Sequence, residues 1–370
     1  MKPVTVLMLV LLAPLAALAR PRWTPAQAAA WYRPQAWPVG CNFIPKDAIN
    51  QLEMWQAATF DPREIDWELG LAESCGMTTV RVFLQDQLWV QDAPGFLARL
   101  STFLDLAERH HIHPLFVLFD SCWNPHPRLG PQPPPRPGLH NSGWVQSPGI
   151  DRLRQTADYP ELKAYVVGVI GAFARDERVF GWDLWNEPQD TAGDAVHNTD
   201  SHGAVAALLP QVFAWARSAE PTQPLTSPLF DGGDWSPAGA AHLSAIARTQ
   251  LEQSDVISFH NYGWPEELEA RITQLEAYGR PILCTEYMAR SVGSTIDGCL
   301  PVGKRHGVAM YNWGLVEGKT QTRFPWDSYI CPYIGREPAV WFHDLFHPDG
   351  TPYRAREIEI LRELTGRGSG

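Results

Sequence analysis

The chain has 370 residues, enough for one large domain or two ordinary ones, and 45% of them are hydrophobic, so a sizeable core is possible. Its formal net charge is -11 and the sequence contains no block of basic residues, which argues against nucleic acid and anionic membranes as partners. The 16 tryptophans are many for this length, and such a number often includes exposed rings that stack on flat apolar faces of ligands.

The first 19 residues have the pattern of a secretory signal peptide. Lys2 precedes an apolar run from Val4 to Ala19, and Ala17-Leu18-Ala19 fits a cleavage site of small residues. The alternative, an N-terminal membrane anchor, is disfavoured because the run is short and no basic cluster follows it. We therefore expect a secreted or periplasmic protein, with residues 20–370 as one domain and no stable membrane insertion after cleavage.

Segments of strand length alternate with segments of helical periodicity along the rest of the chain. The predicted strands are 39–44, 78–84, 114–119, 180–184, 225–230, 256–260, 281–286 and 308–313. The predicted helices are 61–76, 94–107, 162–173, 205–216, 243–251, 268–275, 296–306 and 353–364. The first of these helices has clear signals, with Asp61 as N-cap, Pro62 in the first turn and Gly76 at its end.

Strict alternation of strand and helix indicates a parallel sheet with right-handed crossovers. Eight such units over about 330 residues fit a closed (β/α)8 TIM barrel with long strand-to-helix loops. The rival architecture, an open doubly wound sheet, usually carries a glycine-rich phosphate turn after its first strand, and Gly40-Cys41-Asn42 offers none.

A long irregular stretch, 121–158, follows the third predicted strand. It contains the run Pro133-Pro134-Pro135 and two tryptophans, Trp123 and Trp144. A loop of this length in a compact domain is usually functional or disordered, and the tryptophans argue against disorder.

The carboxyl ends of the strands are where the active site of such a barrel lies. The fourth strand stops in Asn186-Glu187-Pro188, since Pro188 has no N–H for a sheet ladder. The seventh strand ends at Glu286, and strands four and seven face each other across an eight-stranded barrel. Other polar or aromatic residues in or after strand ends are Arg81, Asp120, Trp123, His260, Tyr262 and Trp313.

Two carboxylates across a cleft are what the hydrolysis of a glycosidic bond requires. One of them donates a proton to the leaving oxygen, and the other is ionised and attacks the sugar or activates water. Arg81 would favour ionisation of a neighbouring carboxylate, while an ionised partner would keep the other carboxylate protonated.

With these residues in this order, the chain resembles the clan A glycoside hydrolases, most nearly family 5-type enzymes. The resemblance covers essentially the whole mature chain and rests on Asn186-Glu187-Pro188, His260-x-Tyr262, Thr285-Glu286 and Trp313, with Arg81 on the second strand. It implies a retaining mechanism in which Glu187 is the acid/base and Glu286 the nucleophile, with the carboxyl groups about 5 Å apart.

The resemblance also implies a set of substrate-binding residues. Asn186 would bond the sugar 2-OH, His260 and Tyr262 would orient the nucleophile and the substrate, and Trp313 would lie under the sugar ring. Asp120 stands where many family 5 enzymes carry a histidine, so it is either a ligand of a sugar hydroxyl or a loop cap. Segments 42–45 and 119–123 resemble a less studied subgroup, commonly labelled xylanase-like or cellulase-like by similarity only.

Several structural alternatives stay open. Arg81 could be a structural ion pair, and His260 and Trp313 could belong to the core. For the tryptophans in loops, ordinary packing is as expected as contact with a sugar: Trp123, Trp144, Trp235, Trp264 and Trp326.

The cysteines and histidines give weaker signals. Six cysteines in an exported chain allow disulfides, although their spacing is not that of a small disulfide scaffold. A bridge between Cys299 and Cys331, which lie in loop-like sequence with Cys122, is one possibility. No CxxC or HxxxH pattern indicates a metal site, so we expect neither metal nor cofactor. Buried thiols are predicted in or beside apolar segments at Cys41, Cys75 and Cys284.

The function that the sequence favours is a secreted retaining glycoside hydrolase acting on β-linked, most simply β-1,4-linked, plant-type polysaccharides or their oligosaccharides. A carbohydrate-binding barrel without catalysis and an exo-acting β-glycosidase on small glycosides are the alternatives. A metal-dependent hydrolase or aldolase is disfavoured because no lysine or set of metal ligands ends a strand. A carbohydrate is the expected partner, and a monomer is favoured. Whether the third loop and the segment after strand eight leave a groove or close one end stays open.

Overall fold

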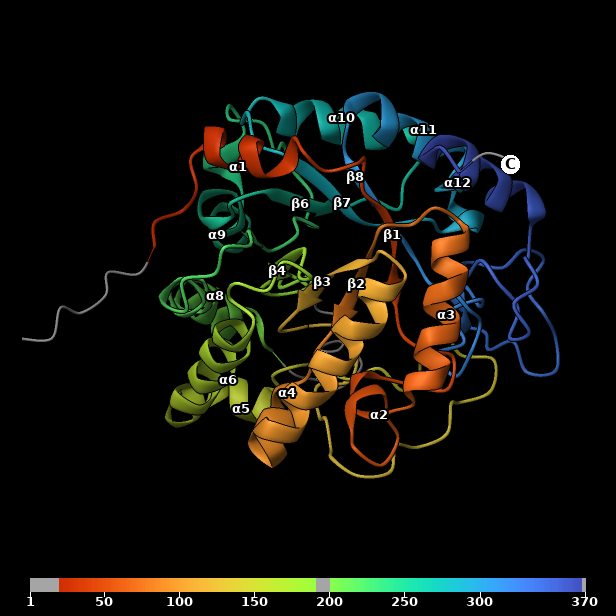
Figure 1. Ribbon diagram of the computed structural model, residues 1–370, viewed down its shortest axis with the longest axis horizontal. Coiled ribbons are helices and arrows are strands. Elements are labelled where there is room, and N and C mark those ends of the chain that lie inside the picture. The colour runs from red at the N-terminus through yellow and green to blue at the C-terminus, as the bar shows by residue number, and fades with distance from the viewer. Residues whose placement is uncertain (1–19, 191–199, 368–370) are drawn as a thin grey trace, which may run out of the picture.

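Eight parallel strands form the barrel that the sequence predicts (Figure 1). The computed structural model describes residues 20–190 and 200–367, so the predicted signal peptide lies outside the described residues. The strands pair in the order β5-β4-β3-β2-β1-β8-β7-β6. Their bounds are β1 (Val39–Phe43), β2 (Thr79–Phe83), β3 (His113–Val117), β4 (Gly181–Asp183), β5 (Leu225–Thr226), β6 (Ile257–His260), β7 (Ile282–Tyr287) and β8 (Ala309–Trp313).

The barrel closes between β5 and β6 through backbone hydrogen bonds just beyond the regular part of β5. The Leu229 N–H donates to the Ser258 carbonyl at 2.9 Å, and the His260 N–H donates to the Leu229 carbonyl at 2.9 Å. Regular strand structure ends at Thr226, earlier than predicted, because Pro228 has no N–H to donate to a ladder.

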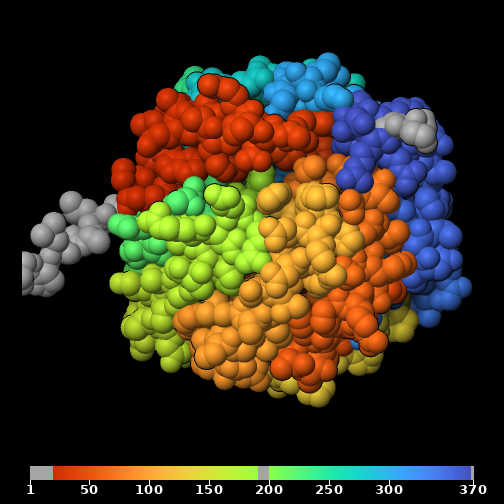
Figure 2. Space-filling model, viewed as in Figure 1, coloured from red at the N-terminus to blue at the C-terminus, as the bar shows by residue number. Residues whose placement is uncertain are grey.

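Helices surround the strands and connect them. On the face shown in Figure 2, α3, α4 and α6 lie side by side, with α1 along the upper edge. No helix among the described residues combines the length and the apolar character that a bilayer span needs. The helices are α1 (Pro25–Tyr32), α2 (Gln51–Trp55), α3 (Pro62–Ser74), α4 (Asp86–Arg109), α5 (Ile150–Arg154), α6 (Tyr159–Ala172), α8 (His202–Ser218), α9 (Ala245–Gln253), α10 (Pro265–Glu276), α11 (Ile296–His306) and α12 (Ala355–Thr365). Short 3-10 helices are η1 (Thr156–Asp158), η2 (Ala240–His242), η3 (Arg290–Val292) and η4 (Trp326–Tyr329).

The start of α3 confirms the capping signal read from the sequence. The Asp61 side chain accepts hydrogen bonds from the backbone N–H groups of Arg63 and Glu64, and Pro62 occupies the first turn. Gly76 follows the helix with a φ of 81°, a left-handed conformation that glycine adopts without a steric penalty.

The N-terminal helix α1 was not predicted from the apolar pattern, although it has a capping box. Thr24 accepts from the Gln27 N–H, and the Gln27 side chain accepts from the Thr24 N–H. Ala28 is fully buried and belongs to a small cluster with barrel residues such as Phe180 and Tyr311, and Trp31 packs against this cluster. Contacts with aromatic residues far along the chain from α1 therefore hold this helix against the barrel.

The helix after β2 begins earlier than its sequence suggests. The prediction starts it at Pro94, whereas α4 begins at Asp86 and contains non-helical dihedral angles at Asp92. The Gln85 side chain caps the start of α4. Pro94 follows the non-helical residue Asp92, and the helix tolerates a proline at this break.

Two long loops on the carboxyl side of the barrel bond to each other. The loop from 121 to 149 follows β3, and the loop from 314 to 354 follows β8. The Gly138 carbonyl accepts from the Tyr333 N–H at 2.9 Å, and the Asn141 N–H donates to the Thr320 carbonyl at 2.8 Å. The first loop is thus ordered, in keeping with its two tryptophans.

The predicted bridge between Cys299 and Cys331 is wrong. All six cysteines are free; Cys299 is buried within α11, whereas Cys331 is exposed in the loop after η4. The helix directs Cys299 into the core, where its sulfur lies 3.7 Å from the Ser294 hydroxyl. The predicted buried thiols are confirmed for Cys41, Cys75 and Cys284.

Candidate active site

The two glutamates singled out by the strand ends meet at the carboxyl end of the barrel. Glu187 follows β4, and Glu286 is the second-last residue of β7. One carboxylate oxygen of each glutamate and a ring nitrogen of His260 all lie within 4.8 Å of one another. Glu187 has a φ of 40°, an uncommon conformation for a residue with a side chain and one that clusters at functional sites.

Glu286 is held by one cation and one hydroxyl. Arg81 Nη1 donates to its Oε1 at 2.7 Å, and the Tyr262 hydroxyl donates to its Oε2 at 2.6 Å. Burial raises the pKa of Glu286 to about 7, and this rise is limited by the opposing effects of Arg81 and of the Tyr262 hydrogen bond. Glu286 is therefore the member of the pair that ionises first.

Glu187 has a different environment without a direct cation. His260 Nδ1 lies 2.6 Å from its Oε1, and the Cys122 thiol donates to its Oε2 at 3.2 Å. Burial and then the charge of Glu286 raise the pKa of Glu187 well above its usual range. The surroundings thus favour a protonated Glu187 beside an ionised Glu286.

His260 contacts both carboxyl groups as a neutral ring. Burial lowers its pKa well below the usual range, and the charge of Arg81 acts in the same direction. Its Nδ1 lies 3.5 Å from Glu286 Oε2 in addition to its shorter contact with Glu187. A neutral imidazole can donate one hydrogen bond from Nδ1 without neutralising the charge on the pair.

Arg81 is the centre of the charge network beneath the glutamates. It is fully buried on β2, and its Nε and Nη2 both donate to Asp183 Oδ2, at 3.0 and 2.8 Å. Nη2 also donates to Asn186 Oδ1 at 2.7 Å, and Nη1 to Asn42 Oδ1 at 2.9 Å. The planar guanidinium therefore fixes the amide of Asn186 as well as Glu286.

Asp120 anchors the first residues of the loop after β3. Its Oδ1 accepts from Asn186 Nδ2 at 2.9 Å and from the Cys122 N–H at 2.9 Å, and its Oδ2 accepts from Trp144 Nε1 at 2.6 Å. Burial raises its pKa to about 6, opposed by these hydrogen bonds. Asp120, left open between a sugar ligand and a loop cap, therefore accepts hydrogen bonds from three residues that line the cavity.

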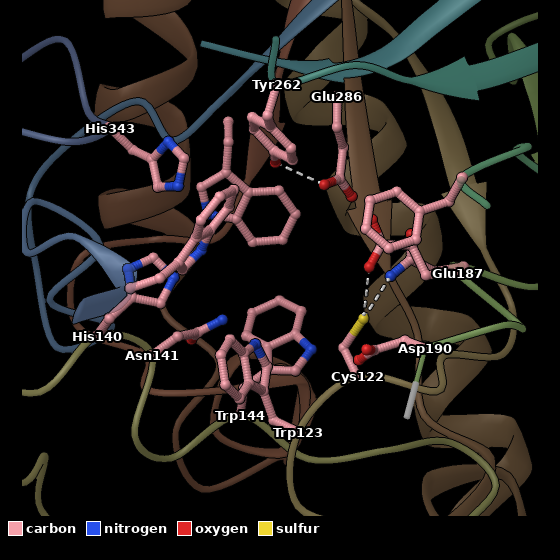
Figure 3. A pocket seen from close by; sticks show the side chains of 14 residues that line it. Cys122, Trp123, His140, Asn141, Trp144, Glu187, Asp190, Tyr262, Glu286 and His343 are labelled. Atoms are coloured by element: carbon pink, nitrogen blue, oxygen red, sulfur yellow. Dashed lines mark hydrogen bonds between the residues drawn. The ribbon is translucent and has the colours of Figure 1, made fainter. Parts of the chain in front are cut away.

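A cavity of about 240 Å³ lies in front of the glutamates, and Figure 3 shows its lining. The rings of four tryptophans and one phenylalanine face it: Trp123, Trp144, Phe230, Trp313 and Trp326. They give the cavity an aromatic character suited to sugar rings. Its lining consists of Cys122, Trp123, His140, Asn141, Trp144, Asn186, Glu187, Asp190, Phe230, Tyr262, Glu286, Trp313, Trp326 and His343.

The candidate residues from the sequence fall into two groups. Lining the cavity beside the glutamates are Trp123, Asn186, Tyr262 and Trp313. Lying behind the lining, and contacting its residues, are Arg81, Asp120 and His260. Of the tryptophans in loops, Trp144 and Trp326 line the cavity, whereas Trp235 is buried against Phe259 and Trp264 is exposed outside it.

Sequence reasoning missed five polar residues of the lining: Cys122, His140, Asn141, Asp190 and His343. Cys122 was seen only as a cysteine in a loop, although it directly follows the third strand and its Asp120-Ser121 end. His140 and Asn141 lie deep in an irregular loop, and His343 lies in the loop after β8. No periodicity or capping signal marks these three positions.

Among the residues that the structure describes, two groups of side chains have donor atoms close enough to hold a cation. One comprises Glu187, His260 and Glu286, and the other Cys122, Glu187 and Asp190. In the first group, the Arg81 guanidinium already bonds Glu286, and His260 Nδ1 bonds Glu187. We assign no metal to either group, and the expected absence of a metal stays a prediction.

The fold is that of a (β/α)8 barrel with paired carboxylates at the carboxyl ends of β4 and β7. No family model matches the chain, and no curated protein matches it. Solved structures do resemble it at low identity. An exo-β-1,4-mannosidase from Opitutaceae bacterium strain TAV5 is 18% identical with a TM-score of 0.60, over 89% of this chain and 60% of that one.

Two further structures are similar. A GH5_18 variant from Streptomyces cattleya, in complex with Manb1-4GlcNAc, is 11% identical with a TM-score of 0.60, over 88% of this chain and 80% of that one. A β-1,4-mannanase from the sea hare Aplysia kurodai is 15% identical with a TM-score of 0.53, over 83% and 96%. At these identities the likeness shows a shared fold, and the chain spans 60% of the length of the exo-mannosidase.

Proposed function

We propose that the protein is a retaining glycoside hydrolase that cleaves β-linked glycosidic bonds. The observation that carries the proposal is the pair Glu187 and Glu286, with oxygens within 4.8 Å, at one edge of an aromatic cavity. Carboxyl groups about 5–5.5 Å apart support a covalent intermediate, whereas inverting enzymes need about 6.5–9.5 Å to admit a water molecule. The low identity to solved structures means that the site, and not the likeness, supports this proposal.

In the first step, ionised Glu286 attacks the anomeric carbon while Glu187 gives its proton to the leaving oxygen. The glycosidic bond breaks, and the sugar is left as an ester of Glu286. In the second step, Glu187 takes a proton from a water molecule, whose oxygen attacks the anomeric carbon and releases Glu286. Two inversions give net retention of configuration.

The surrounding residues support these roles. Arg81 and Tyr262 keep Glu286 ionised and oriented. Asn186 has its carbonyl oxygen bound by Arg81 and its Nδ2 near Cys122 and Asp120, so its position beside Glu187 is fixed for contact with a sugar hydroxyl. Trp313, at the end of β8, supplies an aromatic face under the ring.

β-1,4-linked glycosides are the substrate class that we propose, and β-mannosides are the first to test. The names of similar structures include a β-1,4-mannosidase, a β-1,4-mannanase and a complex with Manb1-4GlcNAc. Glucosides and xylosides with the same linkage belong in the same panel.

The test of the mechanism is the stereochemistry of the first product. During hydrolysis of an aryl β-glycoside, proton NMR should show the β-anomer of the sugar before mutarotation. A 2-deoxy-2-fluoro glycoside with a good leaving group should leave a sugar mass on the peptide that contains Glu286. An α-anomer as first product, or an adduct on another residue, would overturn the mechanism.

We also propose that the protein acts outside the cytoplasm, on the strength of the N-terminal sequence alone. Expressed in a bacterial host, it should be recovered from the periplasm or medium, and sequencing of its mature end should begin at Arg20. A mature protein that retains Met1 and stays in the cytoplasm would contradict this.

The pH dependence of activity follows from the two carboxyl groups. Turnover needs Glu286 ionised and Glu187 protonated, so kcat/KM should rise as the pH increases through about 7 and fall again as Glu187 loses its proton at higher pH. The two limbs belong to the coupled pair. Initial rates on an aryl β-glycoside from about pH 4 to 10 check this; full activity at about pH 5 would contradict it.

Cys122→Ala tests the thiol beside the acid. Its hydrogen bond to Glu187 Oε2 lowers the pKa of that carboxyl, so its removal should move the high-pH limb of the profile to higher pH. The loss of one neutral hydrogen bond should also lower kcat by about 2- to 12-fold. Cys331→Ala, at an exposed cysteine, is the matched control. An unchanged limb would show that the thiol does not act on Glu187.

A further inference from the structure

The side of the cavity that faces the glutamates is lined by residues from the two long loops. His140 and Asn141 come from the loop after β3, and His343 from the loop after β8. Figure 3 shows these three, which we call the end wall, on the opposite side of the cavity from Glu187 and Glu286.

The end wall is fixed by hydrogen bonds between the loops. The His140 N–H donates to Ser328 Oγ at 3.1 Å, and His140 Nδ1 donates to the Phe324 carbonyl at 2.7 Å. The rings of Trp123 and Tyr329 stack at 4.7 Å with an interplanar angle of 6°. The two loops therefore meet over this end of the cavity as one packed unit.

The end wall also presents one buried polar atom without a protein partner among the described residues. Asn141 is 1% exposed, its side chain reaches into the cavity, and its Oδ1 has no hydrogen-bond partner in the described part of the chain. A buried amide without a partner is costly, so such a group indicates a ligand that supplies one.

The two histidines of the end wall are neutral. Burial lowers the pKa of His140 to about 4 and that of His343 well below its usual range. Each donates from Nδ1 to a carbonyl, His140 to Phe324 and His343 to Met288 at 2.5 Å. This tautomer leaves Nε2 of each ring as a hydrogen-bond acceptor, a partner for sugar hydroxyls.

We propose that the end wall makes the protein exo-acting: Asn141, His140 and His343 bind the hydroxyls of the non-reducing terminal sugar, and one sugar is released at a time. This inference rests on the proposed hydrolase function. In the reacting sugar, the anomeric carbon must face Glu286 and the leaving oxygen must face Glu187. C4 lies at the opposite end of a pyranose ring from C1, so the 4-OH faces the end wall.

A chain that continued from that 4-OH would run into the end wall. The cavity volume of about 240 Å³ is also below the roughly 300–1,000 Å³ of pockets that hold drug-sized ligands, which suits one sugar and not several. A groove for internal cleavage would need space for sugars on both sides of the glutamates.

The test uses the wild-type protein on reducing-end-labelled hexasaccharides of β-1,4-linked mannose, glucose and xylose. The expected result is a ladder in which the labelled product shortens by one sugar at a time and the monosaccharide is the other product. A hexasaccharide methylated at its terminal 4-OH should be cleaved at least about a hundredfold more slowly, because the methyl group replaces a donor and enlarges the terminal sugar.

Different outcomes separate the two proposals. Early labelled fragments of mixed length, or efficient cleavage of the methylated hexasaccharide, would overturn exo action and leave the hydrolase function standing. No hydrolysis of any hexasaccharide or aryl β-glycoside would overturn the hydrolase function itself.

Asn141→Ala tests the end wall directly. It should raise KM for unlabelled oligosaccharides and lower kcat/KM by about 5- to 150-fold, since a sugar hydroxyl loses its partner. Gln211→Ala, which removes an exposed amide on α8, is the control. An unchanged KM in a folded Asn141→Ala variant would exclude sugar binding by this residue.

Discussion

Glu286→Gln is expected to lower kcat by about 10⁴-fold or more, equivalent to about 5.5 kcal/mol of transition-state stabilisation. The amide keeps the volume of the side chain and can still accept the hydrogen bond from Tyr262, yet it cannot form the ester with the sugar. Steady-state rates on an aryl β-glycoside measure the loss, and circular dichroism checks that the variant is folded.

Glu187→Gln should behave differently, because in the glycosylation step its proton is needed only by the leaving oxygen. We expect a large fall in kcat with oligosaccharides and a much smaller fall in the glycosylation rate with a dinitrophenyl glycoside, whose oxygen leaves without protonation. Glu108→Gln, at an exposed position on α4, is the matched control for both variants. If both active-site variants kept full turnover, or if their leaving-group dependence were reversed, the assigned roles would be wrong.

Arg81→Met is expected to lower the free energy of unfolding by about 3–5 kcal/mol, in addition to removing activity. The change leaves Asp183 buried without its cation, and Asp183 Oδ1 already has no hydrogen-bond partner in the described residues. Urea titration followed by fluorescence measures the loss.

A second substitution separates the buried charge from the rest of the network. Asp183→Asn added to Arg81→Met should recover part of the stability, because the unpaired charge is gone, while activity stays lost because Glu286 lacks its guanidinium. Arg81→Lys should also be impaired, since one ammonium cannot reach Asp183, Asn186 and Glu286 in the geometry of the guanidinium. Wild-type stability in Arg81→Met would contradict the central role of the residue.

The sequence predicted the barrel and the positions of its two glutamates well because both depend on local signals. Helix starts are marked by caps such as Asp61. Glutamates that follow or end the fourth and seventh of eight strands lie on opposite sides of a barrel, which places Glu187 across from Glu286. Predictions that depended on the path of irregular chain were poorer. The Cys299–Cys331 bridge failed because α11 directs one thiol inward while the other lies on an exposed loop.

The end wall was beyond sequence reasoning for the same physical reason. His140 and Asn141 are placed by hydrogen bonds to carbonyl and hydroxyl groups of the loop after β8, and no propensity encodes such pairings. Asp120 shows the intermediate case. Its position at the end of the third strand could be predicted from the sequence. Its hydrogen-bond partners could not, because they are Trp144 and Asn186, which lie elsewhere in the chain.

The bonds between the two long loops also bear on how the protein is made. His140 and Ser328 are separated by 188 positions, and a contact of this separation pays a large entropy of loop closure before it forms. A ribosome delivers both glutamates and Arg81 well before it delivers Ser328. The hydrogen bonds that fix the end wall can therefore form only after the segment that follows β8 has been synthesised.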